Sequence, residues 1–226
     1  MKKIYFILLA LLLSKETVFA QDDGGEIQGP EVSDLLIEIT GSPFTGTSLL
    51  DFGQFRARYF VSEAIVPRLG IYIDFDNSQS TPDVVTNDNT YTLMPGVEYH
   101  FQRDGKFRSY AAFDFIISSK TASRESSTGP SMDGTTQLPN FGTSSINNFS
   151  FSTGSRGYFQ YGVGLSTGAD YHFNSRFYIG TEIGFQYNRR IYSDIEVDGE
   201  LFQEGTDSNF ANVIFSNSFR VGFKLF

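Results

Sequence analysis

The chain has 226 residues, enough for one domain with a leader, and 40% of them are hydrophobic while only 19% are charged. It contains 24 Phe, 12 Tyr and 22 Gly but no Cys, which excludes a disulfide framework and cysteine-ligated metal sites. The formal net charge of −9 argues against nucleic-acid binding, which needs a basic surface.

Residues 1–20 have the parts of a secretory signal peptide. Two lysines supply the positive charge, an apolar run of ten residues follows, and a small-residue cleavage site precedes Gln21. A membrane anchor is the alternative, but ten residues are too few because a spanning helix needs about 20. We therefore predict a cleaved signal, a flexible acidic segment at 21–32, and a barrel domain at 33–226.

From residue 33 onward the dominant pattern is strict alternation of apolar and polar residues, the period of strands with one apolar face. No apolar run near 18 residues follows the leader, so this chain could cross a membrane only as a closed sheet. Eight alternating segments are predicted strands: about 33–41, 50–62, 65–76, 90–102, 107–119, 156–173, 176–190 and 210–226.

The connections between these segments alternate in length. Those after the second, fourth and sixth segments are short, whereas the others are longer and polar, and the longest covers 119–155. Short turns at one end and long loops at the other are typical of outer-membrane barrels, whose short turns are periplasmic. The sequence therefore predicts an all-β fold, an eight-stranded antiparallel up-and-down transmembrane β-barrel in the cell outer membrane.

A soluble, lipocalin-like barrel would show the same alternation with its apolar face inward. The polar faces favour the membrane barrel because they collect glycines, which suit places where another group must come close. An eight-stranded lumen is just wide enough to be filled by side chains, so larger residues need small neighbours. The predicted lumen glycines are Gly70, Gly96, Gly162, Gly164, Gly168, Gly180, Gly184 and Gly222.

Aromatic residues lie near both ends of the apolar faces, in the positions of two membrane-interface girdles. Near the short turns these are Tyr59, Tyr99, Tyr171 and Phe173, and near the long loops they are Tyr91, Phe115, Phe159 and Tyr187.

The polar faces also carry charges of both signs, Glu38 and Asp76 among them. These charges should pair in a narrow lumen because an unpaired buried charge is costly. The predicted lumen charge network consists of Arg56, Arg58, Arg68, Asp74, Glu98, Asp114, Asp170, Glu182, Arg220 and Lys224. The simpler interpretation is a salt-bridged plug that closes the barrel. The alternative is a narrow pore or a gate whose pairs rearrange.

The segments FRARYFVSEAIVPRLGIYIDFD (55–76) and LMPGVEYHF (93–101) resemble the small outer-membrane β-barrel proteins of Bacteroidota. The resemblance rests on Arg58-Tyr59-Phe60, on Arg68 in the following strand, and on the run from Pro95 to Phe101. It implies an eight-stranded, porin-like barrel in the outer membrane and implies no activity, because such families are defined by fold.

The sequence gives little support for catalysis, and we predict no catalytic, cofactor-binding or metal site. His100 and His172 both lie beside short turns, away from the outer half of a barrel, where barrel hydrolases place their histidine. A weak Ca²⁺ site at the carboxylates of 194–198 is unspecific. The run Asn188-Arg189-Arg190 is either a solvated girdle or a contact to lipopolysaccharide phosphate.

These features predict a structural or interaction protein that works through long extracellular loops. The alternatives are a narrow pore for small polar solutes or ions and a small subunit of a larger outer-membrane complex. The expected partners are outer-membrane lipid and lipopolysaccharide, the barrel-assembly machinery, which reads terminal aromatic residues such as Phe226, and other outer-membrane proteins.

Overall fold

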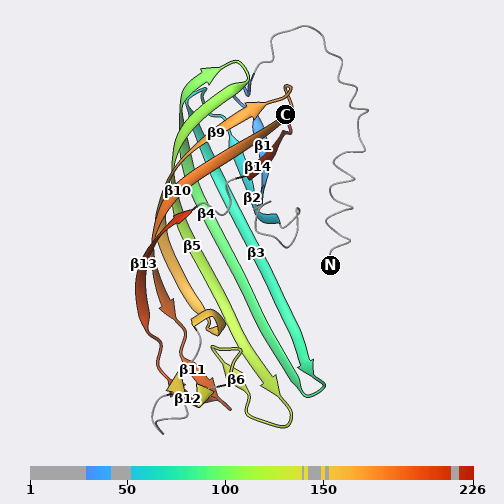
Figure 1. Cartoon of the computed structure of the whole chain (residues 1–226), viewed down its shortest axis with the longest axis vertical. Helices are drawn as coiled ribbons and strands as arrows, with labels where there is room; N and C mark the ends of the chain where they lie inside the picture. Colours follow the sequence, from blue (N-terminus) through green and yellow to red (C-terminus); the bar gives the residue numbers. More distant parts are fainter. Residues whose placement is uncertain (1–28, 42–51, 139, 142–148, 151–152, 215–218) are drawn as a thin grey trace.

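The computed structural model describes residues 29–41, 52–138, 140–141, 149–150, 153–214 and 219–226, and the predicted signal peptide lies outside them. The described part is all-β and antiparallel, as predicted (Figure 1). None of its helices is long and apolar enough to span a membrane. The main strands are β1 (Leu35–Gly41), β2 (Phe52–Tyr59), β3 (Ile65–Thr81), β4 (Val84–Asp104), β5 (Phe107–Ser126), β9 (Tyr158–His172), β10 (Phe177–Tyr192), β13 (Asp207–Ile214) and β14 (Phe219–Lys224).

The strand pairings return to their starting point and form a ring of eight strands. Each neighbouring pair is antiparallel in the order β1, β2, β3, β4, β5, β9, β10 and β14, and β14 pairs β1 again. β13 continues the β14 side of the ring along the far half of β10. Strands therefore occur in all eight predicted segments; the eighth, 210–226, holds both β13 and β14, and residues 215–218 lie outside the described part.

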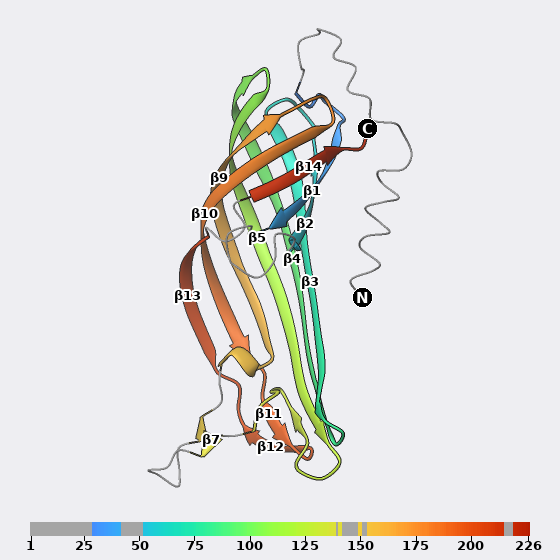
Figure 2. The same ribbon diagram turned by 45° about the vertical axis from the view of Figure 1, so that its right-hand side comes forward.

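The two ends of the ring differ. At the turn end, where β1 begins and β14 finishes, the connections are short, and β4 and β5 are joined through Gly105 in a positive-φ conformation. At the extended end, β3, β4 and β5 run far beyond β1 and β2 (Figures 1 and 2). β2 pairs β3 only as far as Phe55 opposite Ile71, so the wall is taller on one side.

Two predicted loops are partly strands. The connection expected at about 77–89 is instead a continuous hairpin, because β3 and β4 stay paired as far as Thr81 opposite Val84. The alternating Ser, Thr, Asn and Val residues of this stretch suit an exposed ladder, and Pro82 with Asp83 supplies the turn. The prediction of a long loop after every odd-numbered strand was therefore wrong here.

The first residues of the predicted loop 119–155 are the end of strand β5, which runs to Ser126. The next part of this loop pairs with the connection that follows β10. β6 (Met132–Asp133) pairs both β5 and β11 (Ile195–Val197), and β11 pairs β12 (Glu200–Gln203). The remaining short elements are β7 (Asn140–Phe141), β8 (Phe149–Ser150) and the 3₁₀ turn η1 (Thr153–Ser155). Met132 and Ile195 are buried where β6 meets β11, so β6, β11 and β12 form one ordered unit.

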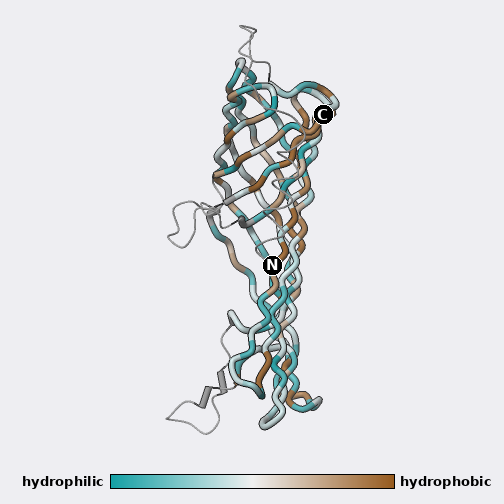
Figure 3. Tube along the Cα trace, turned by 90° about the vertical axis from the view of Figure 1, so that its right-hand side faces the viewer, coloured by the Kyte–Doolittle hydropathy of each residue, from teal (hydrophilic) through white to brown (hydrophobic). Residues whose placement is uncertain are grey.

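The ring buries polar residues and exposes apolar ones. Among the described residues, 19 polar or charged side chains are buried against 10 apolar ones, and 36 large hydrophobic side chains are exposed. Figure 3 shows hydrophobic residues concentrated along the ring and hydrophilic residues prevailing towards the extended end. The alternation of each strand thus points its apolar side chains outward, the reverse of a soluble barrel.

Candidate functional site

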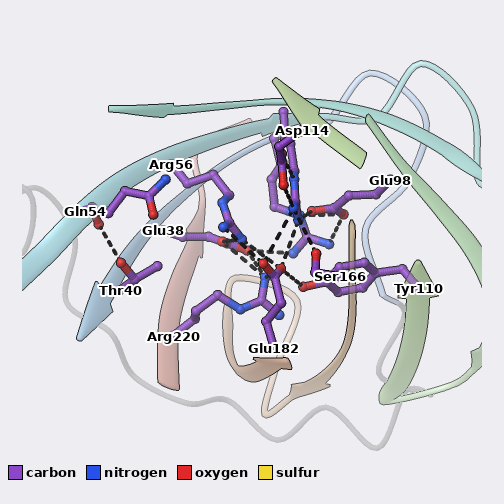
Figure 4. A network of polar contacts seen from close by, with 12 residues as sticks. Glu38, Thr40, Gln54, Arg56, Glu98, Tyr110, Asp114, Ser166, Glu182 and Arg220 are labelled. Carbon is purple, nitrogen blue, oxygen red and sulfur yellow. Dashed lines mark hydrogen bonds and ion pairs between the residues drawn. The ribbon is translucent and has the colours of Figure 1, made fainter. Parts of the chain in front are cut away.

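A network of charged side chains lies inside the ring, and we call it the charged core (Figure 4). Each side chain lies on the inward face because it shares the parity of the polar positions in its strand. The charged core comprises Arg56, Arg58, Arg68 and Arg220 with Glu38, Glu98, Asp114, Asp170 and Glu182. Four cations therefore face five carboxylates.

Arg58 on β2 lies at the centre of the charged core. Its Nη1 is 2.7 Å from Glu38 Oε1 and 2.8 Å from Asp170 Oδ2, and its Nη2 is 2.6 Å from Glu98 Oε2. The guanidinium also lies 5.2 Å from the centroid of the Tyr110 ring. Because Arg58 is 1% exposed, these pairs are formed away from water, where charge-assisted hydrogen bonds are strong and an unpaired charge is costly.

Arg68 on β3 extends the charged core towards the opposite wall. Its Nη1 is 3.1 Å from Glu98 Oε1 and 2.9 Å from Glu182 Oε2, and its Nε donates to Asp114 Oδ1 at 2.7 Å. Arg56 approaches the same Glu182 carboxylate at 3.0 Å. Glu182 of β10 therefore links two arginines that come from neighbouring strands on the other side of the ring.

Two tyrosines complete the hydrogen bonds of the carboxylates. Tyr110 Oη donates to Glu182 at 2.6 Å, and Tyr178 Oη donates to Glu38 at 2.6 Å. Arg220 closes the network, since its Nη2 is 2.7 Å from Asp170 and its Nη1 is 3.3 Å from Glu38. β14, which carries Arg220, is thereby tied to β1 and β9 by side chains.

Glycines make the room for these large side chains. A Cβ on Gly222 would lie 2.0 Å from Tyr178 Cζ, and a Cβ on Gly168 would lie 2.3 Å from Tyr110 Oη. Both glycines stand directly opposite those tyrosines in the strand register. All eight glycines of the predicted set lie beside an inner-face side chain.

Two predicted members do not join the charged core. Asp74 is exposed on β3 beyond the last pairing with β2, where the ring no longer surrounds it. Lys224 lies at the turn end and pairs Asp34 at 2.7 Å instead. Both residues alternate in phase with the inward-facing residues of their strands. Along the ring axis, however, each lies beyond the level of the charged core, at opposite ends.

Tyr110 and Tyr178 contact the charged core, although the predicted network contains neither of them. A signal for the tyrosines was present in the sequence: each shares the inward parity of a predicted charge in its own strand, Asp114 or Glu182. Glu38, a predicted polar-face charge, lies on the inward face of β1 and joins the charged core.

The two histidines lie between the charged core and the turn end. His100 Nε2 is 2.9 Å from Glu98, and its ring packs against Phe60 and Tyr110. The His172 ring packs against Tyr178 with ring centroids 4.9 Å apart. In the described part of the chain neither histidine hydrogen-bonds a serine or threonine hydroxyl.

The predicted carboxylates of 194–198 and the run 188–190 lie outside the charged core. Asp194 and Asp198 accept backbone N–H groups of Gly205 and Ser131, at 2.6 Å and 2.9 Å, and so stabilise the joined loops. No group of three or more His, Cys, Asp or Glu within the described ranges is arranged to hold a metal ion. In the run 188–190, Asn188 is buried and Arg189 is exposed on the outer face.

Comparison with known proteins finds likeness at the level of structure only. No family model and no curated protein sequence matches the chain. One similar solved structure is the N-terminal β-barrel domain of Pseudomonas aeruginosa OprF, at 14% identity and a TM-score of 0.40, covering 87% of this chain and 100% of that one. Another is the outer membrane protein OprG from Pseudomonas aeruginosa, at 11% identity and a TM-score of 0.42, covering 88% and 99%.

Proposed function

We propose that this chain is an integral outer-membrane protein: a closed, eight-stranded transmembrane β-barrel whose lumen is plugged by the charged core. The observation that carries the proposal is the reversed burial, with apolar side chains outside and charges inside. A surface of this kind is costly in water and favourable in lipid, where every backbone group must also be paired within the sheet. Support for that pairing comes from the ring, in which each of the eight strands pairs two neighbours.

The height of the apolar surface fits a bilayer. On β3 the outward residues are apolar from Ile65 to Phe75, and the next outward residue is Asn77. Eleven residues at about 3.3 Å each, in a strand tilted by about 40°, rise roughly 25–30 Å, close to the apolar band of outer-membrane barrels. On β5 the outward apolar run stops at Ile117 and Ser119 follows. The outward apolar residues of β3 and of β5, which lie on either side of β4, therefore both give way to polar residues towards the extended end.

The short-turn end is assigned to the periplasm and the extended end to the cell exterior. In that orientation the ordered unit of β6, β11 and β12 stands outside the membrane as a platform for contacts. The charged core would close the lumen below it, since each arginine of the charged core has at least two carboxylate contacts. The role proposed is therefore a structural or interaction protein.

Folding into lipid vesicles tests the membrane assignment. The native protein should show heat-modifiable migration in SDS gels, and residues 77–81 and 131–133 should be accessible from one side only. A water-soluble monomer that never partitions into vesicles would contradict the assignment.

Planar-bilayer recordings test the plug. The folded protein should give no steady conductance, whereas a reproducible single-channel current would favour the narrow pore. Purification from the native membrane tests the third possibility, because stable recovery with another barrel would favour a subunit role.

A further inference from the structure

The inner face of the wall carries a second cluster near the extended end, away from the charged core. It lies where the start of β9 pairs the end of β10, with Tyr158 opposite Tyr192 and Gln160 opposite Arg190. Arg190 is eight residues along β10 from Glu182 of the charged core. The cluster is therefore a separate group of side chains at the rim.

Arg190 is held rigidly but has no acidic partner in the part of the chain that the structure describes. Its Cζ lies 4.0 Å from the Tyr158 ring centroid and 5.0 Å from that of Phe210, so the guanidinium sits against two rings. Nε and Nη2 both donate to Gln160 Oε1, at 2.9 Å and 2.6 Å. Gln160 itself donates to Asn188 Oδ1 at 3.2 Å. The Nη1 edge of a preoriented guanidinium is left for another acceptor.

Arg156 lies against the Tyr192 ring, which Arg190 also approaches. Its Cζ is 5.3 Å from the Tyr192 ring centroid, and Arg190 Cζ is 6.0 Å from that centroid. Arg156 is only 5% exposed, and its Nη2 donates to Ser193 O at 2.7 Å. Its buried Nε has no hydrogen-bond partner among the described residues. A buried donor without a partner is uncommon and calls for a ligand or an ordered water.

The surrounding carboxylates are already engaged. Asp88 pairs Lys120 at 2.7 Å, and Asp207 pairs the outward Arg189 at 2.5 Å. Asp194 lies near Arg156, but its Oδ1 accepts the N–H of Gly205. In a chain of net charge −9, two guanidinium groups that form no ion pair with any described residue thus lie against one shared ring, that of Tyr192.

We propose that Arg190 and Arg156 form an oxyanion-binding site that takes the phosphate or carboxylate group of a small solute. A planar guanidinium fork matches such groups, and one that is already fixed by rings and an amide loses little entropy when it binds. The site follows from the contacts above and goes beyond the structural role; only its exposure to the cell exterior rests on the proposed membrane orientation.

The test is an NMR titration of the folded, ¹⁵N-labelled full chain in neutral alkyl-glucoside micelles. Inorganic phosphate is the probe, at constant ionic strength maintained with chloride. The Nε–Hε signals of Arg190 and Arg156 should shift saturably. Arg190→Gln should weaken phosphate binding about tenfold or more, because a hydrogen bond to a charged group is lost, and Arg190→Lys should weaken it less.

Arg189→Gln is the matched control, because it removes the neighbouring charge on the opposite face of the same strand. It should leave phosphate affinity unchanged. Absence of a saturable shift in folded wild-type protein would overturn the site, as would equal affinities of wild type and folded Arg190→Gln. Heat-modifiable migration of each variant separates loss of the site from loss of the barrel.

Phosphatidylethanolamine vesicles with and without lipid A distinguish the source of the oxyanion. If lipid A competes with free phosphate at Arg190, the group comes from a lipid headgroup; if it does not, a free solute is the ligand. Competition that is abolished by Arg189→Gln but survives Arg190→Gln would place the contact on the outer face and refute the proposal.

Discussion

Replacing Arg58 by Ala should be the most damaging single change in the charged core. The substitution removes the partner of Glu38, Glu98 and Asp170 at once and leaves five carboxylates facing three arginines. Breaking one buried ion pair by removing one partner costs about 3–5 kcal/mol, because the other charge remains buried. We therefore expect the free energy of unfolding to fall by at least about 3 kcal/mol.

Urea unfolding in lipid vesicles, followed by gel mobility, measures this loss. Arg103→Ala is the control, because Arg103 forms an ion pair with Glu63 in which both side chains are exposed. Such a surface pair contributes at most about 1 kcal/mol. Arg58→Met retains most of the apolar stem without the charge, so it should lose nearly as much stability as Arg58→Ala. If Arg58→Ala costs no more than Arg103→Ala, the reasoning about buried charge is refuted.

Three further changes test other parts of the structure. Gly222→Ala should lower the free energy of unfolding by about 1–3 kcal/mol through overpacking, because its Cβ would meet the Tyr178 ring at 2.0 Å. Gly164→Ala, whose Cβ would have its nearest neighbour at 3.6 Å, should be nearly neutral in the same unfolding assay. Leu165→Arg, at an outward position that is 61% exposed, should lower the free energy of unfolding in vesicles by about 2–4 kcal/mol. Thr121→Arg, beyond the apolar band, should lower it by only about 0–1 kcal/mol, and equal losses would contradict the band. Tyr178→Phe should lose about 1–3 kcal/mol of stability, because the β1 carboxylate loses a 2.6 Å hydrogen bond; an unchanged unfolding midpoint would show that water replaces it.

The sequence by itself determined where the strands of the ring lie and which face each of their side chains takes. Period-two alternation is a local property, so it identified Arg58, Glu98 and Asp170 as inward and Leu165 as outward without any knowledge of pairing. The same rule would have identified Tyr110 and its opposite glycine, Gly168.

Only the tertiary structure decided which inward residues meet. Arg58 contacts carboxylates 20, 40 and 112 residues away in the chain, and those contacts depend on how each strand is staggered against the next. Alternation fixes the face of a residue but not its height, so Asp74 shares the inward parity yet lies above the ring of paired strands. Alternation likewise does not show how far β3 and β4 stay paired before the turn at Pro82. It also does not show that Arg190 meets aromatic rings from β9 and β13. Height is set by strand register around the whole ring, which is a non-local property that no single segment encodes.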